Sequence, residues 1–214
     1  MGRIRLAYPK IPDSSNAPLG KCFAFEKYDG TNLHWVWERE LGWYAFGTRR
    51  NRFDLDEAGI NGFNQAHPGL EESSELFLQT LGEPLNDIFR EQYPQNSEMI
   101  VYTEFFGPQS FAGMHKADDP KQLILFDIAT EAGILGPEAF LNDFGHLPVA
   151  AVVYRGKFNG QFASDVRAGK YDVTEGVICK GGSGSDLWMA KIKTDDYMSR
   201  LKAAFAEKWE QYWE

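Results

Sequence analysis

The stretch that decides the fold runs from Phe23 to Trp37 and reads FAFEKYDGTNLHWVW. Two apolar runs, residues 23–25 and 33–37, flank a polar segment that contains a lysine, an aspartate and a glycine. Apolar runs bounded by turn residues are typical of β-strands, so this stretch predicts a strand, a tight loop and a second strand. We expect Lys27 in the polar segment to face the space above the sheet.

Lys27 supports two interpretations. An Asp-Gly pair between strands is a common hairpin turn, and in that case Lys27, Asp29 and Gly30 are ordinary turn residues. Alternatively, Lys27 is a nucleophile whose pKa is lowered by neighbouring cations, because only the neutral amine has a lone pair with which to attack. Asp29 would then shape the loop, and Gly30 would let a ligand approach the backbone closely. Residues 27–30 alone do not decide between the two interpretations.

Composition limits the class of protein. The chain has 214 residues, 43% of them hydrophobic and 14% aromatic, which is typical of an ordered globular protein of one domain. Apolar runs are too short to cross a bilayer, and the N-terminus lacks the apolar core of a signal peptide. Cys22 and Cys179 lack the spacing of a zinc cluster or a disulfide framework, so a reduced, cytoplasmic setting is expected. The net charge of -9 means that any contact with nucleic acid must use a local basic patch.

The order of the remaining elements predicts an α+β fold with largely antiparallel sheets and flanking helices, because strands and helices mix without a regular βαβ rhythm. Residues 1–20 are expected to form a strand-poor lead-in, and 49–64 a loop. The segment 71–93 has helical spacing, with Ser73 as its cap and with an interruption at Gly82 and Pro84 that gives two helices or a kinked one. Other strands are expected at 21–26, 33–38, 43–48, 99–106, 122–129, 149–158, 176–179 and 187–192; other helical segments are expected at 137–144, at 166–168 and over about the last twenty residues, with Met198, Leu201, Ala204, Phe205 and Trp209 on one face.

The polar segment is the first of several motifs that occur in order along the chain. KYDGTN, which begins at Lys27, resembles the nucleotidyltransferase motif of the lysyl-adenylate superfamily of DNA ligases, RNA ligases and RNA capping enzymes. Its Thr-Asn ending is similar to the RNA ligase 2 branch, whereas DNA ligases and capping enzymes more often have arginine where Asn32 stands. Further segments resemble the superfamily's other motifs in the expected order: Thr48-Arg49-Arg50, Thr103-Glu104-Phe105-Phe106-Gly107, Phe126-Asp127-Ile128, Glu175-Gly176-Val177-Ile178-Cys179-Lys180 and Lys191-Ile192-Lys193.

The resemblance, which extends over residues 26–193, implies a fold. It implies an ATP-grasp-like nucleotidyltransferase catalytic domain that occupies residues 1–214 as a single domain. Related RNA ligases carry a separate C-terminal module, and DNA ligases and capping enzymes carry an oligonucleotide-binding barrel after the Lys-x-Lys strand. Because residues 194–214 alone follow that strand here, we expect no accessory domain.

The resemblance also implies roles for the cationic and aromatic residues. Lys27 is expected to attack the α-phosphorus of ATP and to carry AMP as a phosphoramidate. Lys191 and Lys193 alternate along a strand, so both point into the site, and their charge lowers the pKa of Lys27. Phe126 is expected to stack on adenine. A guanidinium suits phosphate oxygens, and the candidates are Arg50 or, if the alignment shifts by one, Arg49.

The implied carboxylates are hard oxygen ligands. Glu104 and Glu175 suit Mg²⁺ or Mn²⁺ or the ribose hydroxyls, and Asp29 and Asp127 are expected to join that shell. A preference for ATP over GTP is expected to arise near Glu26. The remaining nucleotide-binding candidates are Asn32 and Lys180.

Together these motifs predict an ATP-dependent polynucleotide ligase of the RNA ligase 2 type. AMP passes from Lys27 to a 5′-phosphate end, and a 3′-hydroxyl then displaces AMP to join the strands, with RNA favoured. The alternatives are a minimal DNA ligase, an adenylyltransferase that stops at the activated end, and a non-catalytic homologue that binds nucleotide or strand ends. Grip on nucleic acid is expected to be modest or to come from a protein partner. The basic residues available for it are Arg49, Arg50, Arg52, Lys116 and Lys180.

Overall fold

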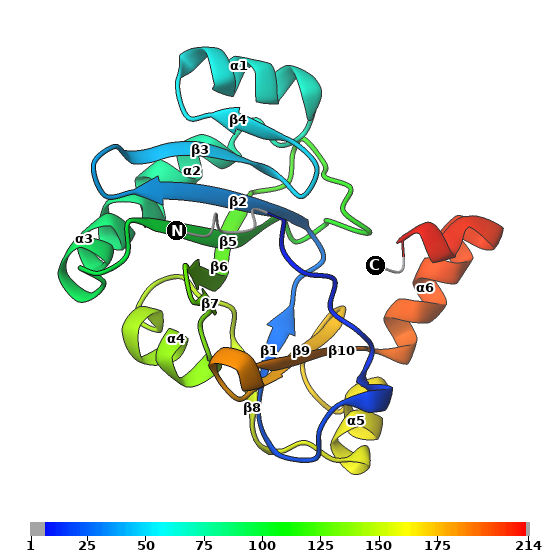
Figure 1. Ribbon diagram of the computed structural model, residues 1–214. Helices are drawn as coiled ribbons and strands as arrows, with labels where there is room; N and C mark the ends of the chain where they lie inside the picture. The colour runs from blue at the N-terminus through cyan, green and yellow to red at the C-terminus, as the bar shows by residue number, and fades with distance from the viewer. Residues whose placement is uncertain (1–6, 213–214) are drawn as a thin grey trace. The chain divides into compact units, whose positions relative to one another are not determined.

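The computed structural model describes residues 7–212, with side chains as far as residue 210. The chain folds into two compact units. The first comprises Met1–Tyr8 and Gly30–Val149, and the second comprises Pro9–Asp29 and Ala150–Glu214. The chain therefore passes from one unit to the other inside the Lys27 motif, between Asp29 and Gly30. Figure 1 follows the chain from its blue N-terminal part to its red C-terminal helix.

The first unit is built on a six-stranded sheet with the order β4-β3-β2-β5-β6-β7. Every neighbouring pair in it is antiparallel, as predicted for the fold class. Its strands are β2 (Thr31–Glu38), β3 (Gly42–Thr48), β4 (Arg52–Asp54), β5 (Glu98–Phe106), β6 (Gln122–Thr130) and β7 (Gly133–Ile134), and its helices are α1 (Glu57–Ala66), α2 (Ser73–Phe77), α3 (Glu83–Gln92) and α4 (Pro137–Phe144).

Helices α2 and α3 pack against one face of this sheet (Figure 1). The ring of Trp35 in β2 stacks on Phe77 of α2, with ring centroids 4.0 Å apart and planes 3° from parallel. Trp37 of β2 contacts Phe89 of α3 at 5.3 Å. Because side chains alternate along a strand, residues 32 and 34 of β2 project from the opposite face. The helix-covered face is thus the aromatic core, and the other face is free to carry polar groups.

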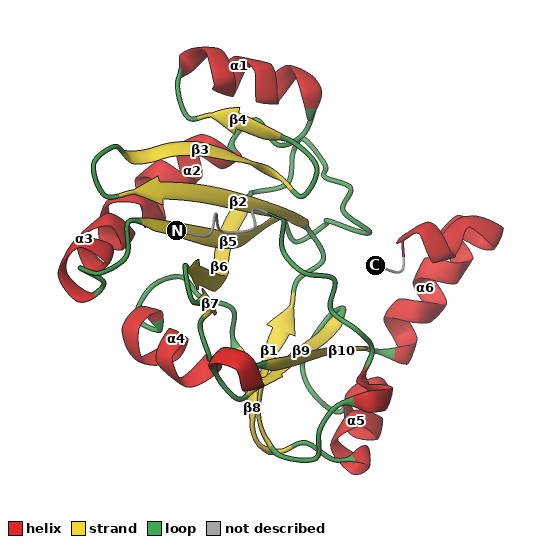
Figure 2. Cartoon of the chain, in the orientation of Figure 1, coloured by secondary structure: helices red, strands yellow, loops and turns green. Residues whose placement is uncertain are grey.

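The second unit is built on a four-stranded antiparallel sheet with the order β10-β9-β1-β8. Cys22 and Ala24 of the first strand share one face with Val177 and Cys179 and form a buried core with Phe162. Both cysteines are free thiols. The elements, shown by type in Figure 2, are β1 (Lys21–Lys27), β8 (Val152–Lys157), β9 (Gly176–Gly181), β10 (Trp188–Lys193), α5 (Gly160–Arg167) and α6 (Asp195–Phe205), with short 3₁₀ turns at Ser14–Asn16 and Gly184–Asp186 and a longer 3₁₀ segment at Ala206–Tyr212.

The predicted loop at 49–64 is wrong, because it contains β4 and α1. The four glycine and asparagine residues within α1 are weak helix formers, so residue propensity did not predict this helix. Asp56 caps α1 by accepting a hydrogen bond from the Gly59 N–H at 2.7 Å. The buried ring of Phe63 then fixes the helix against Phe46 of the sheet. Capping and tertiary packing outweigh propensity here.

Two other helix predictions are corrected by the structure. Ser73 is the first residue of α2 and caps nothing; the N-cap position is Glu72, without a side-chain cap. The turn expected at 166–168 is the end of α5, whose N-cap is Asn159. From Ser73 to Gln92 the helical segments follow one another without a break. The expected interruption is the π-helical segment Leu78–Gly82, followed by Pro84 in the first turn of α3. Proline is tolerated there because a first-turn N–H has no helical partner.

The ends of the chain are described only in part. The described portion of the lead-in, from residue 7, has no strand longer than an isolated bridge at Asp13, and residues 1–6 lie outside the described range. In the C-terminal helix Leu201 of the predicted apolar face is buried, whereas Ala204 is exposed and residues 213–214 are not described. Besides Leu201, Tyr197 is buried in α6. Within residues 7–212 we find no helix that is long and apolar enough to span a membrane.

Replacing Phe77 by alanine should lower the free energy of unfolding by about 3–5 kcal/mol, because it empties a buried site between Trp35 and Trp43. The neighbouring Leu78 is 47% exposed and supplies a matched control. We expect Leu78→Ala to cost less than about 1 kcal/mol. Urea unfolding of the two variants checks this, and equal losses would contradict the assigned aromatic core.

Candidate active site

Lys27, Lys191 and Lys193 project from one face of the second unit's sheet. Lys27 ends β1 opposite Gly176 of β9, and Lys193 of β10 is opposite the same glycine from the other side. Residues directly opposite in antiparallel strands share a face, and Lys191 joins them because it lies two residues before Lys193. Gly176 makes this spacing possible: a Cβ there would lie 2.0 Å from the backbone oxygen of Ile192. The glycine of the Glu-Gly motif is therefore a steric requirement for pairing β9 with β10.

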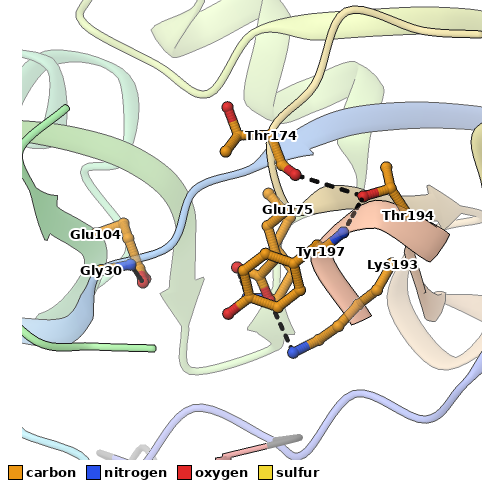
Figure 3. A network of polar contacts seen from close by, with 8 residues as sticks. Gly30, Glu104, Thr174, Glu175, Lys193, Thr194 and Tyr197 are labelled. Atoms are coloured by element: carbon orange, nitrogen blue, oxygen red, sulfur yellow. Dashed lines mark hydrogen bonds and ion pairs between the residues drawn. The ribbon is translucent and has the colours of Figure 1, made fainter. Parts of the chain in front are cut away.

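Glu175 bridges two of these lysines. Its Oε2 lies 2.8 Å from Nζ of Lys27. Its Oε1 lies 2.9 Å from Nζ of Lys193 (Figure 3). The side chains of Glu175 and Lys193 are only 2% and 3% exposed, whereas that of Lys27 is 21% exposed. A buried charge without a partner is costly, so the three groups depend on one another. Each oxygen of Glu175 holds one ammonium group in a fixed position.

The electrostatics of the triad are set mainly by burial. Burial lowers the pKa of Lys193, and the positive charge of Lys27 lowers it further. The carboxylates of Glu175 and Asp29 act in the opposite direction, because a neighbouring negative charge favours the ammonium form. Burial and the carboxylates therefore shift the pKa of Lys193 in opposite directions. Loss of either carboxylate neighbour must lower that pKa.

Tyr197 is a residue of this site that the motif reasoning missed. Its ring lies 5.0 Å from Nζ of Lys193, within the range of a cation–π interaction. Its buried hydroxyl forms a hydrogen bond with Asp29, and its pKa is raised by burial and by the charges of Glu175 and Asp29. Tyr197 therefore connects the Lys27 motif to the Lys-x-Lys strand within the second unit.

The start of α6 fixes Tyr197 in this position. Thr194 caps the helix, with its hydroxyl accepting a hydrogen bond from the Tyr197 N–H at 3.2 Å and donating to the Thr174 carbonyl at 3.5 Å (Figure 3). The Thr194 N–H also donates to the Glu175 carbonyl at 2.9 Å. The sequence signal was available: a threonine followed by two aspartates is a typical helix start, and it places Tyr197 in the first turn.

The polar face of the first unit carries the other predicted ligand residues. Asn32 is opposite Glu104, and Tyr102 is opposite both His34 and Asp127. These residues share the face that the helices leave uncovered.

Gly30 and Glu104 form a close contact at the start of β2. The Gly30 N–H donates to Glu104 Oε1 at 3.1 Å (Figure 3). A Cβ at Gly30 would lie 2.3 Å from the backbone oxygen of Phe105. The glycine of the Asp-Gly pair is thus required by the approach of the loop to β5, which a simple two-residue hairpin turn does not explain.

Phe126 lies at a β-bulge. Asp127 is opposite Tyr102 and Leu125 is opposite Thr103, so Phe126 is the extra residue on its strand. A bulge redirects a side chain and is common beside functional sites. The half-buried ring of Phe126 meets the ring of Tyr8 edge-on at 5.0 Å, and the Tyr8 hydroxyl donates to the buried carboxylate of Asp127. Tyr8 was missed because nothing in a single sequence connects the lead-in to this strand.

The arginine candidates lie in the turn between β3 and β4, where Arg49 and Arg50 are both exposed. The charge of Arg49 acts on the Tyr8 hydroxyl and lowers its pKa against the larger raising effects of burial and Asp127. Arg49 is thus the arginine whose charge reaches the Tyr8–Asp127 pair. Neither arginine forms an ion pair within the described residues.

Two predicted nucleotide ligands lie away from Lys27. Glu26 is opposite Val177, so it lies on the core face of the sheet and not on the face of Lys27. Burial raises the pKa of Glu26. Lys180 shares the face of Lys27 but is opposite Phe23, near the other end of the strand. Its ammonium lies 4.9 Å from the ring of Phe25. The structure thus groups Lys27, Lys193, Glu175 and Asp29 with Tyr197, and leaves Glu26 apart.

The predicted metal ligands do not form a ready cluster: the described part of the chain contains no group of three or more His, Cys, Asp or Glu side chains able to hold an ion. Both oxygens of Glu175 are in ion pairs, and Asp127 is buried against Tyr8. Glu104 is only half-buried and lies on the polar face. Mg²⁺ commonly binds through one or two carboxylates together with substrate phosphates, and Glu104 fits that role best.

Comparison with solved structures identifies the fold. No protein-family model matches the sequence, and neither does a curated protein. An archaeal ATP-dependent RNA ligase matches with a TM-score of 0.60 and 18% identity, over 93% of this chain and 51% of that one. A mutant of a Naegleria gruberi RNA ligase, solved with ATP and Mn, matches with a TM-score of 0.58 and 14% identity, over 91% and 58% of the two chains.

These matches confirm the fold that the motif resemblance implied. The chain has the α+β fold of these ATP-dependent RNA ligase structures. The same fold recurs in a second archaeal ligase form at a TM-score of 0.57. The chain spans only 51–58% of the length of these structures.

His34 should make the fold sensitive to mild acid. It is 3% exposed, and burial, opposed only in part by a hydrogen bond with the Thr48 backbone, lowers its pKa to about 4. The His34 imidazole takes up a proton near pH 6.5 in the unfolded chain but only near pH 4 in the folded chain. The free energy of unfolding therefore falls as the pH drops from about 6.5 to about 4. The shift corresponds to a loss of about 3 kcal/mol.

Unfolding free energies of wild type and His34→Leu, measured between pH 7 and pH 4.5, isolate this contribution. The variant should lose less stability than wild type over that range, because leucine does not titrate. His146→Gln, at an exposed histidine, should follow wild type. Parallel pH curves for wild type and His34→Leu would refute the assignment.

Proposed function

We propose that the chain is the nucleotidyltransferase part of an ATP-dependent RNA ligase that works through a lysyl-AMP intermediate. The observation that carries the proposal is the buried Glu175 bridge between Lys27 and Lys193. An exposed lysine in an ordinary hairpin turn would need no such carboxylate, and buried charges that shift one another's pKa values are typical of functional sites. The likeness to RNA ligases adds support through the fold.

The proposed first step uses Lys27 as nucleophile. The neutral amine attacks the α-phosphorus of ATP, a nitrogen–phosphorus bond forms, the bond to the bridging oxygen breaks, and pyrophosphate leaves. The amine proton must leave Lys27, and Glu175 Oε2 at 2.8 Å is in position to receive it. The nearby charge of Lys193 favours the neutral amine, because like charges disfavour two ammonium groups in a buried site. Lys191, on the same face, is assigned to the α-phosphate oxygens.

The ion pair and the reaction oppose each other. While Glu175 holds Lys27, it stabilises the ammonium form, which cannot attack. Glu175 can take the proton from Lys27, or its carboxylate can move to a new partner. In either case Lys27 keeps only Lys193 as a charged neighbour, which lowers the pKa of Lys27. Asp29 is held by Tyr197 throughout, which keeps the loop in place.

The first unit supplies the remaining assignments. Phe126 is proposed to stack on adenine. The bulge leaves this residue without a partner residue on β5 and redirects its side chain. Glu104 is proposed to bind Mg²⁺ or Mn²⁺, a cation that would neutralise phosphate charge when bound. Asn32, opposite Glu104, and the exposed Arg49 and Arg50 are assigned to nucleotide or end-phosphate oxygens.

The later steps require strand ends as partners. AMP moves from Lys27 to a 5′-phosphate, and a 3′-hydroxyl then displaces AMP to form a phosphodiester bond. A panel of nicked duplexes with RNA or DNA on the 3′-hydroxyl side tests the preference for RNA, and sealing of all-DNA nicks alone would replace the RNA ligase by a minimal DNA ligase. Covalent AMP without any sealing would leave an adenylyltransferase.

Lys27→Ala should abolish covalent attachment of AMP after incubation with ATP and Mg²⁺, as followed by intact-protein mass spectrometry. Lys27→Arg is the matched control, because it keeps the charge beside Glu175 but cannot act as the nucleophile. We expect both variants to be inactive and the arginine variant to keep the thermal stability of wild type. An AMP adduct on Lys27→Ala would overturn the assignment of the nucleophile.

Tyr197→Phe should slow AMP attachment about tenfold or more, because a hydrogen bond to a charged group contributes about 1.5–3 kcal/mol. It removes only the hydroxyl that holds Asp29. An Asp29 carboxylate that moves away no longer raises the pKa of Lys193, so the alkaline limb of the pH–rate profile should shift to lower pH. Tyr171→Phe in the same unit is the control. A slower rate with an unshifted pH profile would assign Tyr197 to packing.

A further inference from the structure

The chain enters the first unit at Gly30 and Thr31, directly after the loop that carries the proposed nucleophile. On the upstream side of this crossing, Asp29 is held by the hydroxyl of Tyr197. On the downstream side, the Gly30 N–H is held by Glu104. Thr31 begins β2 and has no part in the proposed reaction, yet a histidine outside the motifs holds its hydroxyl.

That histidine is His115, in the segment of residues 107–121 that connects β5 to β6 and is termed the β5–β6 loop below. Its Nε2 lies 2.8 Å from Thr31 Oγ1, and its Nδ1 lies 3.3 Å from Ser110 Oγ. The half-buried ring contacts the ring of Phe105, with centroids 5.3 Å apart. Both ring nitrogens therefore have hydroxyl partners, one in β2 and one in the loop itself.

The β5–β6 loop is closed by a buried carboxylate. Asp119 is 4% exposed, and its Oδ2 accepts a hydrogen bond from the Gln109 N–H at 2.8 Å. A Cβ at Gly107 would lie 2.1 Å from the same oxygen, so the glycine of the Glu-x-x-Gly segment lets the two ends of the loop meet. The Gly107 N–H donates to Ser110 Oγ at 2.8 Å, which fixes one of the hydroxyls that contact the histidine.

The tip of the β5–β6 loop reaches the same point of the chain. Phe111 and Met114 exchange both backbone hydrogen bonds, at 3.2 and 3.0 Å, around a turn of two residues. Those residues, Ala112 and Gly113, have φ angles of 53° and 73°. A positive φ strains alanine and persists only where surrounding contacts fix it. A Cβ at Gly113 would lie 3.5 Å from the Gly30 carbonyl oxygen, which places the tip beside the crossing.

The contact between His115 and Thr31 lies on the face of β2 that faces away from the candidate ligand residues. Thr31 is opposite Phe105, whose ring the imidazole contacts. Asn32 is opposite Glu104 and projects from the other face. Neither His115 nor Thr31 is therefore placed to touch a nucleotide on the polar face.

The surroundings of His115 keep its ring neutral. Burial is the main cause that lowers the pKa of this imidazole, and the charge of Lys121 lowers it further, while Asp119 acts in the opposite direction. A neutral imidazole has one donor and one acceptor nitrogen. Hydroxyl groups can serve as partners to both, so the two contacts of the ring are satisfied together.

We propose that His115 is a positioning residue for the reaction at Lys27. The inference rests on the proposed function and adds a residue to it. The imidazole acts through Thr31 and fixes the downstream end of the loop, whereas the contact between Asp29 and Tyr197 fixes the upstream end. With both ends held, the loop presents the amine in one position. A loose end would reduce the fraction of time in which the amine is placed to attack.

The test follows covalent AMP attachment by intact-protein mass spectrometry over a range of ATP concentrations. His115→Ala and Thr31→Val each remove the contact, and each should lower the rate at saturating ATP about three- to tenfold, the range for one neutral hydrogen bond. The ATP concentration that gives half the maximal rate should stay as in wild type, because neither side chain lies on the face assigned to the nucleotide. Thr31→Ser and His115→Gln keep a hydrogen-bonding group and should recover most of the rate.

His67→Ala is the matched control. His67 is also half-buried in the first unit, forms a side-chain hydrogen bond with Asn51 at 3.3 Å and packs on the ring of Phe63. Its removal should lower the melting temperature as His115→Ala does but leave the rate of AMP attachment unchanged.

The double variant Thr31→Val/His115→Ala separates a shared contact from two independent effects. It should be no slower than either single variant, because each removes the same hydrogen bond. Losses that multiply in the double variant overturn the inference, as does a wild-type rate in His115→Ala or an equal loss of rate in His67→Ala. A wild type that forms no lysyl-AMP overturns the proposed function itself.

Discussion

A carboxylate buried between two ammonium groups is the interaction on which the candidate site depends. The buried carboxylate of Glu175 contacts Lys27 and Lys193, and loss of any one of these three charges would leave a buried partner uncompensated. The backbone that holds the three groups is regular antiparallel sheet, so their geometry follows from register. Gly176 is the condition for that register, because a side chain there would collide with Ile192. The chemistry of the site is thus decided by one carboxylate and one missing Cβ.

Both sheets separate their two faces by function. In the first unit the tryptophans of β2 pack beneath the helices, while Glu104, Tyr102 and Asp127 share the other face. In the second unit the cysteine-containing face is the core, and the lysine face carries charge. Successive side chains of a strand point to opposite faces, so one strand supplies apolar residues to the core and polar residues to the other face. This explains why polar motif residues can interrupt apolar strands without loss of the fold.

The sequence predicted the parts of the fold that have strong local signals. The strands around Lys27 and the helix at 137–144 were found because apolar runs, turn residues and a first-turn proline determine them. Helix α1 was missed because its stability comes from the Asp56 cap and the packing of Phe63, not from propensity. Tyr8 was missed for another reason: it meets Asp127 across 119 residues of chain, and no local pattern reports such a contact.

The same distinction applies to the site residues. The motif resemblance predicted Lys27, Lys191 and Lys193 as catalytic residues and Glu175 as a ligand for metal or ribose. In the structure both of its oxygens are occupied by lysines, so any ligand must compete with an ion pair. Under the proposed function that competition would give the site a resting state, because a carboxylate partner favours the ammonium form of Lys27, which cannot attack. A nucleotide that draws Glu175 or its negative charge away from Lys27 would release the amine at the moment when the α-phosphate is present, and activation of the nucleophile would then be coupled to binding of the substrate.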